Sequence, residues 1–171
     1  KITFEVKTKA MYEELENAFG LLSEIMTTSS LEDENRILEI VAEMKSRMQG
    51  NMTSAGHSLA AIRAMSYFSE TAAVSEMVSG IPCLRLLEKI EADFDGNKKE
   101  LIEKLGELAR CIFRPENLMV DFTASEEGYE KLKPLVPVLK NSLFTETVRK
   151  EHFAVELAKK NEGFEILNHG V

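Results

Sequence analysis

The 171-residue sequence contains no tryptophan, only four prolines and two cysteines, and no long apolar run. A transmembrane helix needs about 20 consecutive apolar residues, so the sequence predicts no membrane partner. The two cysteines, Cys83 and Cys111, are too few for a zinc ribbon, and free thiols are expected ahead of a single disulfide. Basic residues are outnumbered, with 21 Lys and Arg against 29 Asp and Glu. The net charge of -8 disfavours nucleic acid as a partner, because phosphates attract an excess of Lys and Arg.

Sequence motifs that carry chemistry are also missing. The zinc motifs HExxH and HxxEH, glycine-rich phosphate loops and the GxSxG nucleophile elbow do not occur. His57 is followed one helical turn later by Ala60 and Ala61, which offer no metal ligand. His152 and Glu156 would face one side of a helix, but they lie in a charged segment that favours a solvated surface helix. The sequence therefore predicts no catalytic residue, no metal site and no cofactor in this chain.

Helical periodicity fills most of the chain between two candidate strands. Apolar residues recur every three or four positions, as at 84, 87 and 90, which predicts amphipathic helices. Residues 2–7 alternate apolar and polar side chains, and LMVDFT at 118–123 is a second strand candidate. Two strands alone make a poor sheet. We therefore expect an α+β fold, with long helices packed on a small, mostly antiparallel and incomplete sheet.

The composition changes near residue 145. Residues 1–144 carry the helical block with both candidate strands, and we expect them to form one domain. Lys, Glu and Thr dominate 145–162, and GFEILNHGV at 163–171 is a short apolar stretch that stops mid-pattern. We expect 145–171 to be a linker and the first strand of a following domain. The chain is thus expected to be a piece of a larger protein.

The segment SAGHSLAAIRAMSYFS at 54–69 differs from its charged surroundings. It has no acidic residue and is rich in small residues, which predicts a narrow helix at the centre of the bundle. His57 and Arg63 would then be partly buried groups that bond to helix ends or carboxylates, with direct ligand contact as the alternative. On this interpretation the substitution His57→Ala lowers stability. An enzyme that uses His57 with Arg63 or Glu76 is disfavoured, because the sequence shows no orienting partner.

Residues 56–90, GHSLAAIRAMSYFSETAAVSEMVSGIPCLRLLEKI, resemble the peptidase-associated domain of presequence-protease-like, insulinase-type zinc metallopeptidases. The resemblance extends to the strand-then-helix pattern at 1–26, to RPENL at 114–118 and to NEGFEILNHGV at 161–171. The positions that carry the family motif are Gly56, His57, Ser58, Arg63, Glu76 and Gly80. These family-motif positions are predicted to be structural or to face a peptide chamber, not to be catalytic.

The resemblance implies a noncatalytic third domain of a large clamshell enzyme that hydrolyses unfolded peptides with zinc. In that family, the zinc motif lies in the first domain and a substrate-binding Arg/Tyr pair in the fourth. The implied partners are the remaining domains of the parent peptidase and unfolded peptides. The implied role is part of the chamber wall, whose negative charge would suit basic peptides.

The resemblance also implies a location: a soluble protein of the cytoplasm in a bacterium, or of an organelle matrix in a eukaryote. From the residues alone, a free-standing helical interaction module without enzymatic activity is the alternative function.

Overall fold

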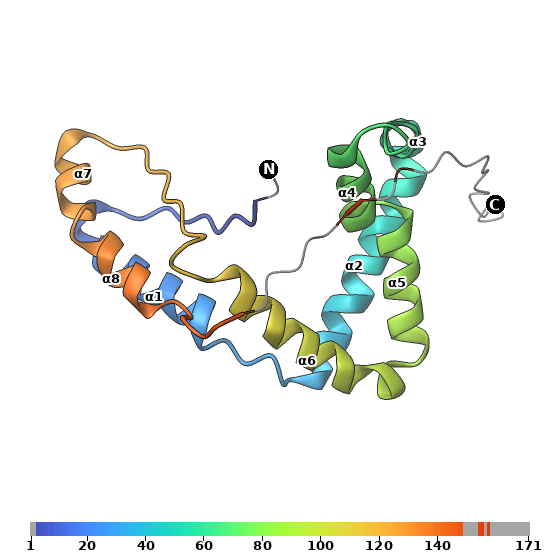
Figure 1. Ribbon diagram of the computed structural model, residues 1–171, viewed down its shortest axis with the longest axis horizontal. Helices are drawn as coiled ribbons and strands as arrows, with labels where there is room; N and C mark the ends of the chain where they lie inside the picture. The colour runs from blue at the N-terminus through green and yellow to red at the C-terminus, as the bar shows by residue number, and fades with distance from the viewer. Residues whose placement is uncertain (1–2, 149–153, 156, 158–171) are drawn as a thin grey trace. The chain divides into compact units, whose positions relative to one another are not determined.

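The computed structural model describes residues 3–148, 154–155 and 157, and the regular secondary structure of these residues is entirely helical. Figure 1 shows the helices in chain order. They are η1 Tyr12–Glu14 (a 3₁₀-helix), α1 Leu15–Thr27, α2 Glu34–Ser54, α3 Gly56–Met65, α4 Glu70–Ser79, α5 Ile81–Ala92, α6 Phe94–Ile112, α7 Glu126–Leu132 and α8 Leu135–Ser142.

The chain divides into two compact units. The first, named here the α2–α5 unit, is built on residues 33–99. The second, the α1–α8 unit, combines residues 3–32 with 100–148 among the described residues. Helix α6 starts in the α2–α5 unit and continues into the other.

The predicted α+β fold is wrong for the described part of the chain, which contains no strand. Both candidate segments run without helix, but residues 3–10 and 118–124 make no backbone–backbone hydrogen bond with any described residue. A side-chain pattern decides which residues share a face, whereas a sheet also needs a second backbone within about 4.8 Å. The candidate strand at 163–171 lies outside the described residues, and the domain boundary at 144 stays a prediction.

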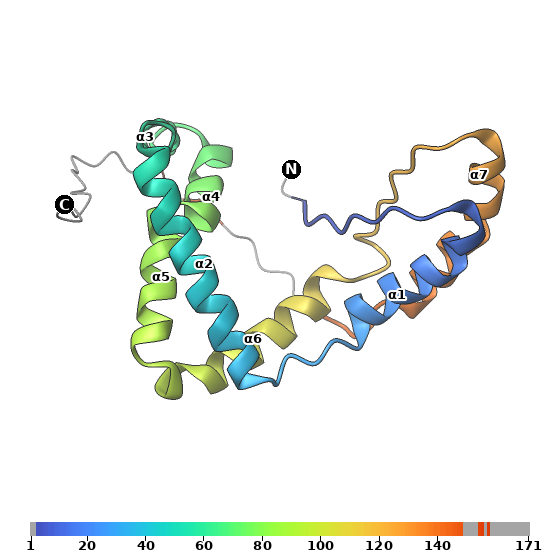
Figure 2. The ribbon, with the colours of Figure 1, turned by 180° about the vertical axis from the view of Figure 1, so that it is seen from behind.

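In the α2–α5 unit, helices α2 and α5 lie side by side and α4 packs on α5 (Figures 1 and 2). Helix α3 contacts α4 and the end of α2. The predicted apolar stripe of α5 is confirmed, since Leu84, Leu87 and Ile90 are all buried. Burying each such side chain stabilises the fold by roughly 1.5–3 kcal/mol. The stripe lies in a core that also contains Val41, Ala72, Ala73 and Ile81.

In the α1–α8 unit, helices α1 and α8 pack together around a buried core. Its members are Met26, Leu139 and Leu143, with Phe19, Leu22, Phe113 and Leu118 packed against them. The Ser125 hydroxyl caps α7 by accepting the Gly128 N–H at 3.5 Å, and the Tyr12 hydroxyl accepts the Ser125 N–H at 3.1 Å. Residue 128 is glycine because a Cβ there would lie 2.6 Å from the Tyr12 ring. Pro134 separates α7 from α8.

The RPENL element at 114–118 caps the C-terminal end of α6. The Asn117 side-chain amide donates to two carbonyls of the last turn of α6, at 2.9 and 3.3 Å, which satisfies acceptors that a helix end leaves open. The buried Arg114 side chain pairs with Glu116 at 2.6 Å and donates to the Glu146 carbonyl at 2.6 Å. The RPENL element therefore terminates helix α6.

Candidate functional site

Three of the family-motif residues, Arg63, Glu76 and Gly80, meet where α3, α4 and α5 join. Ser69 begins helix α4, which carries Glu76. Its side chain caps this helix by accepting the Ala72 N–H at 3.3 Å. The turn at 66–69 folds α4 back against α3. It brings Arg63 beside Glu76 although the two are 13 positions apart in sequence.

Arg63 and Glu76 form a buried ion pair. The Arg63 Nη1 atom lies 3.2 Å from the Glu76 Oε1 atom, and the two side chains are 17% and 3% exposed. A carboxylate taken this far out of water is costly unless a cation and hydrogen bonds compensate it. The Arg63 guanidinium supplies that compensation and ties α3 to α4.

The same glutamate explains why residue 80 is glycine. The Gly80 N–H donates to the Glu76 carbonyl at 2.8 Å, at the point where α4 ends. A Cβ on residue 80 would lie 2.6 Å from that carbonyl oxygen and would also collide with the Glu76 carboxylate. The φ angle of -102° is open to any residue, so glycine is required for space and not for its backbone freedom.

The other three family-motif residues, Gly56, His57 and Ser58, form the first turn of α3. His57 and Ser58 are exposed, and α3 has no buried residue. The predictions of a closely packed central helix and of a partly buried His57 are therefore wrong. The alanines of α3 face solvent, where alanine stabilises a helix through its intrinsic propensity and needs no packing partner.

Two long-range ion pairs of the α2–α5 unit gave no sequence signal. Lys45 on α2 pairs with Glu91 on α5, and Lys98 lies 2.8 Å from Glu34. Lys98 also lies 2.9 Å from Asp95, three positions earlier in the sequence. Both acidic partners raise the pKa of Lys98. Lys45 and Glu91 are 46 residues apart in sequence, and Lys98 and Glu34 are 64 residues apart. Only the folded chain brings these partners together.

The described residues do not fit a zinc site, because they contain no group of three or more His, Cys, Asp or Glu side chains arranged to hold a metal ion. His152 and Glu156 lie outside the described part of the chain. Cys83 and Cys111 are free thiols; Cys83 is half-buried, and this burial raises the pKa of its thiol. None of the described helices combines the length and apolar character needed to cross a bilayer.

Comparison with known proteins identifies the family. The family described as peptidase M16-C associated matches residues 1–90, which include all the family-motif positions. The chain belongs to this family. This match, together with the presequence proteases among the relatives described next, confirms the resemblance to presequence-protease-like peptidases.

Curated relatives of the peptidase-associated chain are much longer. It is 30% identical to protein HypA of Clostridium perfringens over 159 residues, which are 93% of this chain and 16% of HypA. It is 24% identical to presequence protease 1, chloroplastic/mitochondrial, of Arabidopsis thaliana, over 77% of this chain and 12% of that protein. It is 25% identical to the mitochondrial presequence protease of Danio rerio, over 66% and 11%. The chain thus spans less than a fifth of these relatives, and no solved structure matches it significantly.

Proposed function

We propose that residues 1–144 are a noncatalytic domain of a zinc-dependent, presequence-protease-like peptidase and form part of the wall of its peptide-degradation chamber. The family match carries this proposal. The chain aligns with HypA over 93% of its own length while covering 16% of HypA, and two other relatives are named presequence proteases. Other domains of the parent polypeptide would supply the zinc ligands and the groups that cleave unfolded peptides. Residues 145–171 would lead into the next domain.

The contacts of the family-motif residues support a structural role for this domain. Arg63 and Glu76 neutralise each other in a buried pair, and Gly80 provides the space that the Glu76 side chain occupies. Arg63 and Glu76 thus join α3 to α4, and Gly80 allows α5 to begin beside Glu76. A domain that forms part of a chamber wall must keep its helices in fixed positions while peptides bind and leave, and these contacts hold them.

The charge of the chain supports basic peptides as the substrates that pass this wall. Its 29 acidic and 21 basic residues give a net charge of -8. Complementary charge raises the rate at which oppositely charged partners meet, and it does so most strongly at low salt. Capture of a basic unfolded peptide should therefore weaken as the salt concentration rises.

Photo-crosslinking in the full-length polypeptide tests the wall role. The protein is treated with a chelator to stop cleavage and is mixed with a basic unfolded peptide that carries a benzophenone group. We expect crosslinks within residues 1–144 that an excess of unlabelled peptide abolishes. Crosslinks confined to other domains would contradict the wall role. A native polypeptide that ends near residue 171 would contradict the domain assignment and favour a free-standing module.

A further inference from the structure

Two consecutive residues at the end of α6, Phe113 and Arg114, contact segments from both ends of the α1–α8 unit. The Phe4 ring meets the Phe113 ring edge to face, with ring centroids 5.5 Å apart. The Phe144 N–H donates to the Phe113 carbonyl at 3.0 Å, and the Arg114 guanidinium donates to the Glu146 carbonyl at 2.6 Å. The segment that contains Phe4 precedes the helices of this unit, and residues 143–148 follow them.

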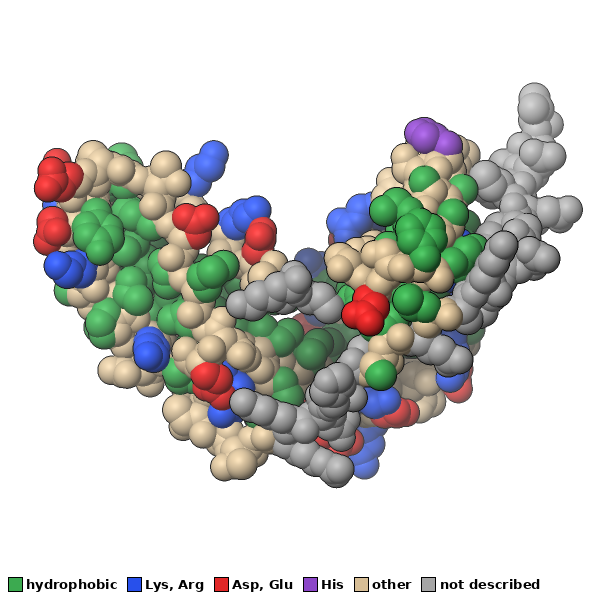
Figure 3. Space-filling model, turned by 45° about the horizontal axis from the view of Figure 1, so that its top comes forward, with side chains coloured by type: hydrophobic (Ala, Val, Ile, Leu, Met, Phe, Trp, Pro, Cys, Tyr) green, Lys and Arg blue, Asp and Glu red, His purple; other side chains and the backbone are tan. Residues whose placement is uncertain are grey.

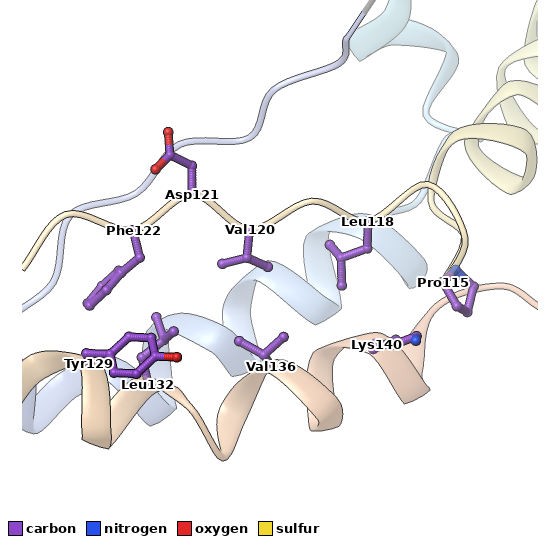
Figure 4. A pocket seen from close by; sticks show the side chains of 9 residues that line it. All are labelled: Pro115, Leu118, Val120, Asp121, Phe122, Tyr129, Leu132, Val136 and Lys140. Carbon is purple, nitrogen blue, oxygen red and sulfur yellow. The ribbon is translucent and has the colours of Figure 1, made fainter.

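Phe113 and Arg114 are themselves fixed to the body of the unit. Phe113 packs against the buried core. Arg114 is 8% exposed, and the Glu116 carboxylate 2.6 Å away compensates its buried charge. Farther along the same segment, Val120 and Phe122 point toward helices α7 and α8 (Figure 4). The contacts with both end segments therefore start from a rigid part of the unit.

The segment after α8 depends on these two residues for its position. Among the described residues, the bond from the Phe144 N–H to the Phe113 carbonyl is the only backbone–backbone hydrogen bond of residues 144–148. Residues 145–147 are exposed and not helical. Water can satisfy an exposed carbonyl, so the contribution of the Arg114 contact is to hold this backbone at one place.

We propose that Phe113 and Arg114 form a double anchor for the two connections between this domain and the rest of the parent polypeptide. The anchor holds the entering chain through Phe4 and the leaving chain through residues 144 and 146. A movement of one neighbouring domain that pulls on one segment is passed to the other segment through contacts between adjacent residues. The inference rests on the proposed function in one respect, namely that the chain is one domain of a longer polypeptide.

Surface contact is the alternative way to position a neighbouring domain. Apolar side chains gather on one face of the α1–α8 unit (Figure 3). An open groove of about 570 Å³ also lies between the segment 115–122 and helices α7 and α8 (Figure 4). If such surfaces alone position the neighbouring domains, substitutions at the double anchor leave the domain arrangement unchanged.

Hydrogen exchange in the full-length polypeptide tests the link between the two segments. We expect Phe4→Ala to raise the exchange rate of the Phe144 amide at least about fivefold, because the Phe4 ring holds the residue that accepts this amide. The control is Met11→Ala in the same segment, since Met11 is 73% exposed and Phe4 is 63% exposed. The control should leave the Phe144 amide unchanged. No effect of Phe4→Ala, or an equal effect of both substitutions, overturns the proposal.

Fluorescence energy transfer in the full-length polypeptide tests the effect on the neighbouring domains. One dye is attached at the exposed residue Glu130 of α7 and the other at the C-terminus of the full-length polypeptide. We expect Arg114→Met to widen the distance distribution at least about twofold, because domains without fixed connections move relative to each other. The matched control is Arg110→Met, which removes an exposed arginine of α6 and should leave the distribution unchanged. An unchanged distribution in Arg114→Met overturns the proposal in favour of surface contact.

The Phe113 amide shows whether α6 itself survives the substitution. It donates to the Ala109 carbonyl at 2.9 Å, so its exchange rate should be the same in Arg114→Met and in the wild type. If Arg114→Met unfolds the end of α6, the Phe4→Ala comparison still decides, because it leaves the buried arginine in place.

The two proposals fail separately. A native polypeptide that ends near residue 171 removes the proposed function together with this inference. A longer polypeptide in which the entry and exit segments respond independently removes this inference alone.

Discussion

The carboxylate of Glu76 lies 3.2 Å from the guanidinium of Arg63, across the turn that joins α3 to α4, and is almost completely buried. The next helix begins against the same glutamate, because residue 80 has no side chain that would displace it. One buried acid therefore fixes three helices of the peptidase-associated chain relative to one another.

Removing the cation of this pair should be strongly destabilising. The substitution Arg63→Met leaves the Glu76 carboxylate buried without its cation, which we expect to cost roughly 3 kcal/mol of unfolding free energy. The matched control is Arg36→Met, since the Arg36–Glu39 pair has side chains 63% and 67% exposed. Exposed pairs contribute little, so the control should lose less than about 0.5 kcal/mol. Urea denaturation followed by circular dichroism measures the unfolding free energy of both variants. Equal losses would contradict a larger contribution of the buried pair.

Alanine should have opposite effects at two glycines. Gly80→Ala places a Cβ 2.6 Å from the Glu76 carbonyl oxygen, and we expect a loss of about 1–3 kcal/mol. Gly50 lies inside α2 with nothing within 4 Å of the position that a Cβ would take, so Gly50→Ala should gain about 0.5–1 kcal/mol through helix propensity. Thermal melts of the two variants give the signs directly. A stabilising Gly80→Ala would refute the steric explanation.

His57 should be dispensable for stability. Because its side chain is exposed, we expect His57→Ala to change the unfolding free energy by less than about 0.5 kcal/mol. Leu139 is 5% exposed in the core of the α1–α8 unit, and Leu139→Ala should cost about 2–4 kcal/mol. The contrast is measured by urea denaturation of each variant. A loss at His57 that matches the loss at Leu139 would restore the interpretation of His57 as a packed residue.

The two thiols should react at different rates. Burial raises the pKa of the Cys83 thiol, so less of its reactive thiolate is present at a mildly alkaline pH, and access to it is also restricted. Cys111 is exposed. We expect iodoacetamide to label Cys111 before Cys83, and the labelling of Cys83 to accelerate as the pH rises toward its raised pKa. Peptide mapping after timed quenching follows both, and faster labelling of Cys83 would contradict its burial.

The sequence predicted correctly which residues are buried where this depends on the spacing within a single helix. The stripe of Leu84, Leu87 and Ile90 on α5 depends only on helical spacing and on the need to bury apolar surface, and all three residues are buried. The sequence also predicted a helix end or a carboxylate as the partner of Arg63, and the structure shows a carboxylate, that of Glu76. Which carboxylate it is was not predicted, because that depends on the angle at which the turn at 66–69 returns the chain.

The errors have two physical causes. The strand candidates failed because a strand requires a second backbone, which no side-chain pattern within 3–10 or 118–124 can provide. The prediction that His57 is buried was wrong because alanine and other small residues are compatible with two different structures. They allow close packing, and they also stabilise an exposed helix such as the one that contains His57.

The claim that the chemistry lies outside residues 1–171 can be tested by removing every histidine from them in the full-length polypeptide. The chain has three histidines, so the variant is His57→Ala/His152→Ala/His169→Ala. Zinc content is measured by mass spectrometry, and cleavage of an unfolded peptide is measured before and after chelation. We predict unchanged zinc content and undiminished zinc-dependent cleavage. Loss of zinc and cleavage in a variant that keeps its helical circular dichroism would contradict a noncatalytic domain.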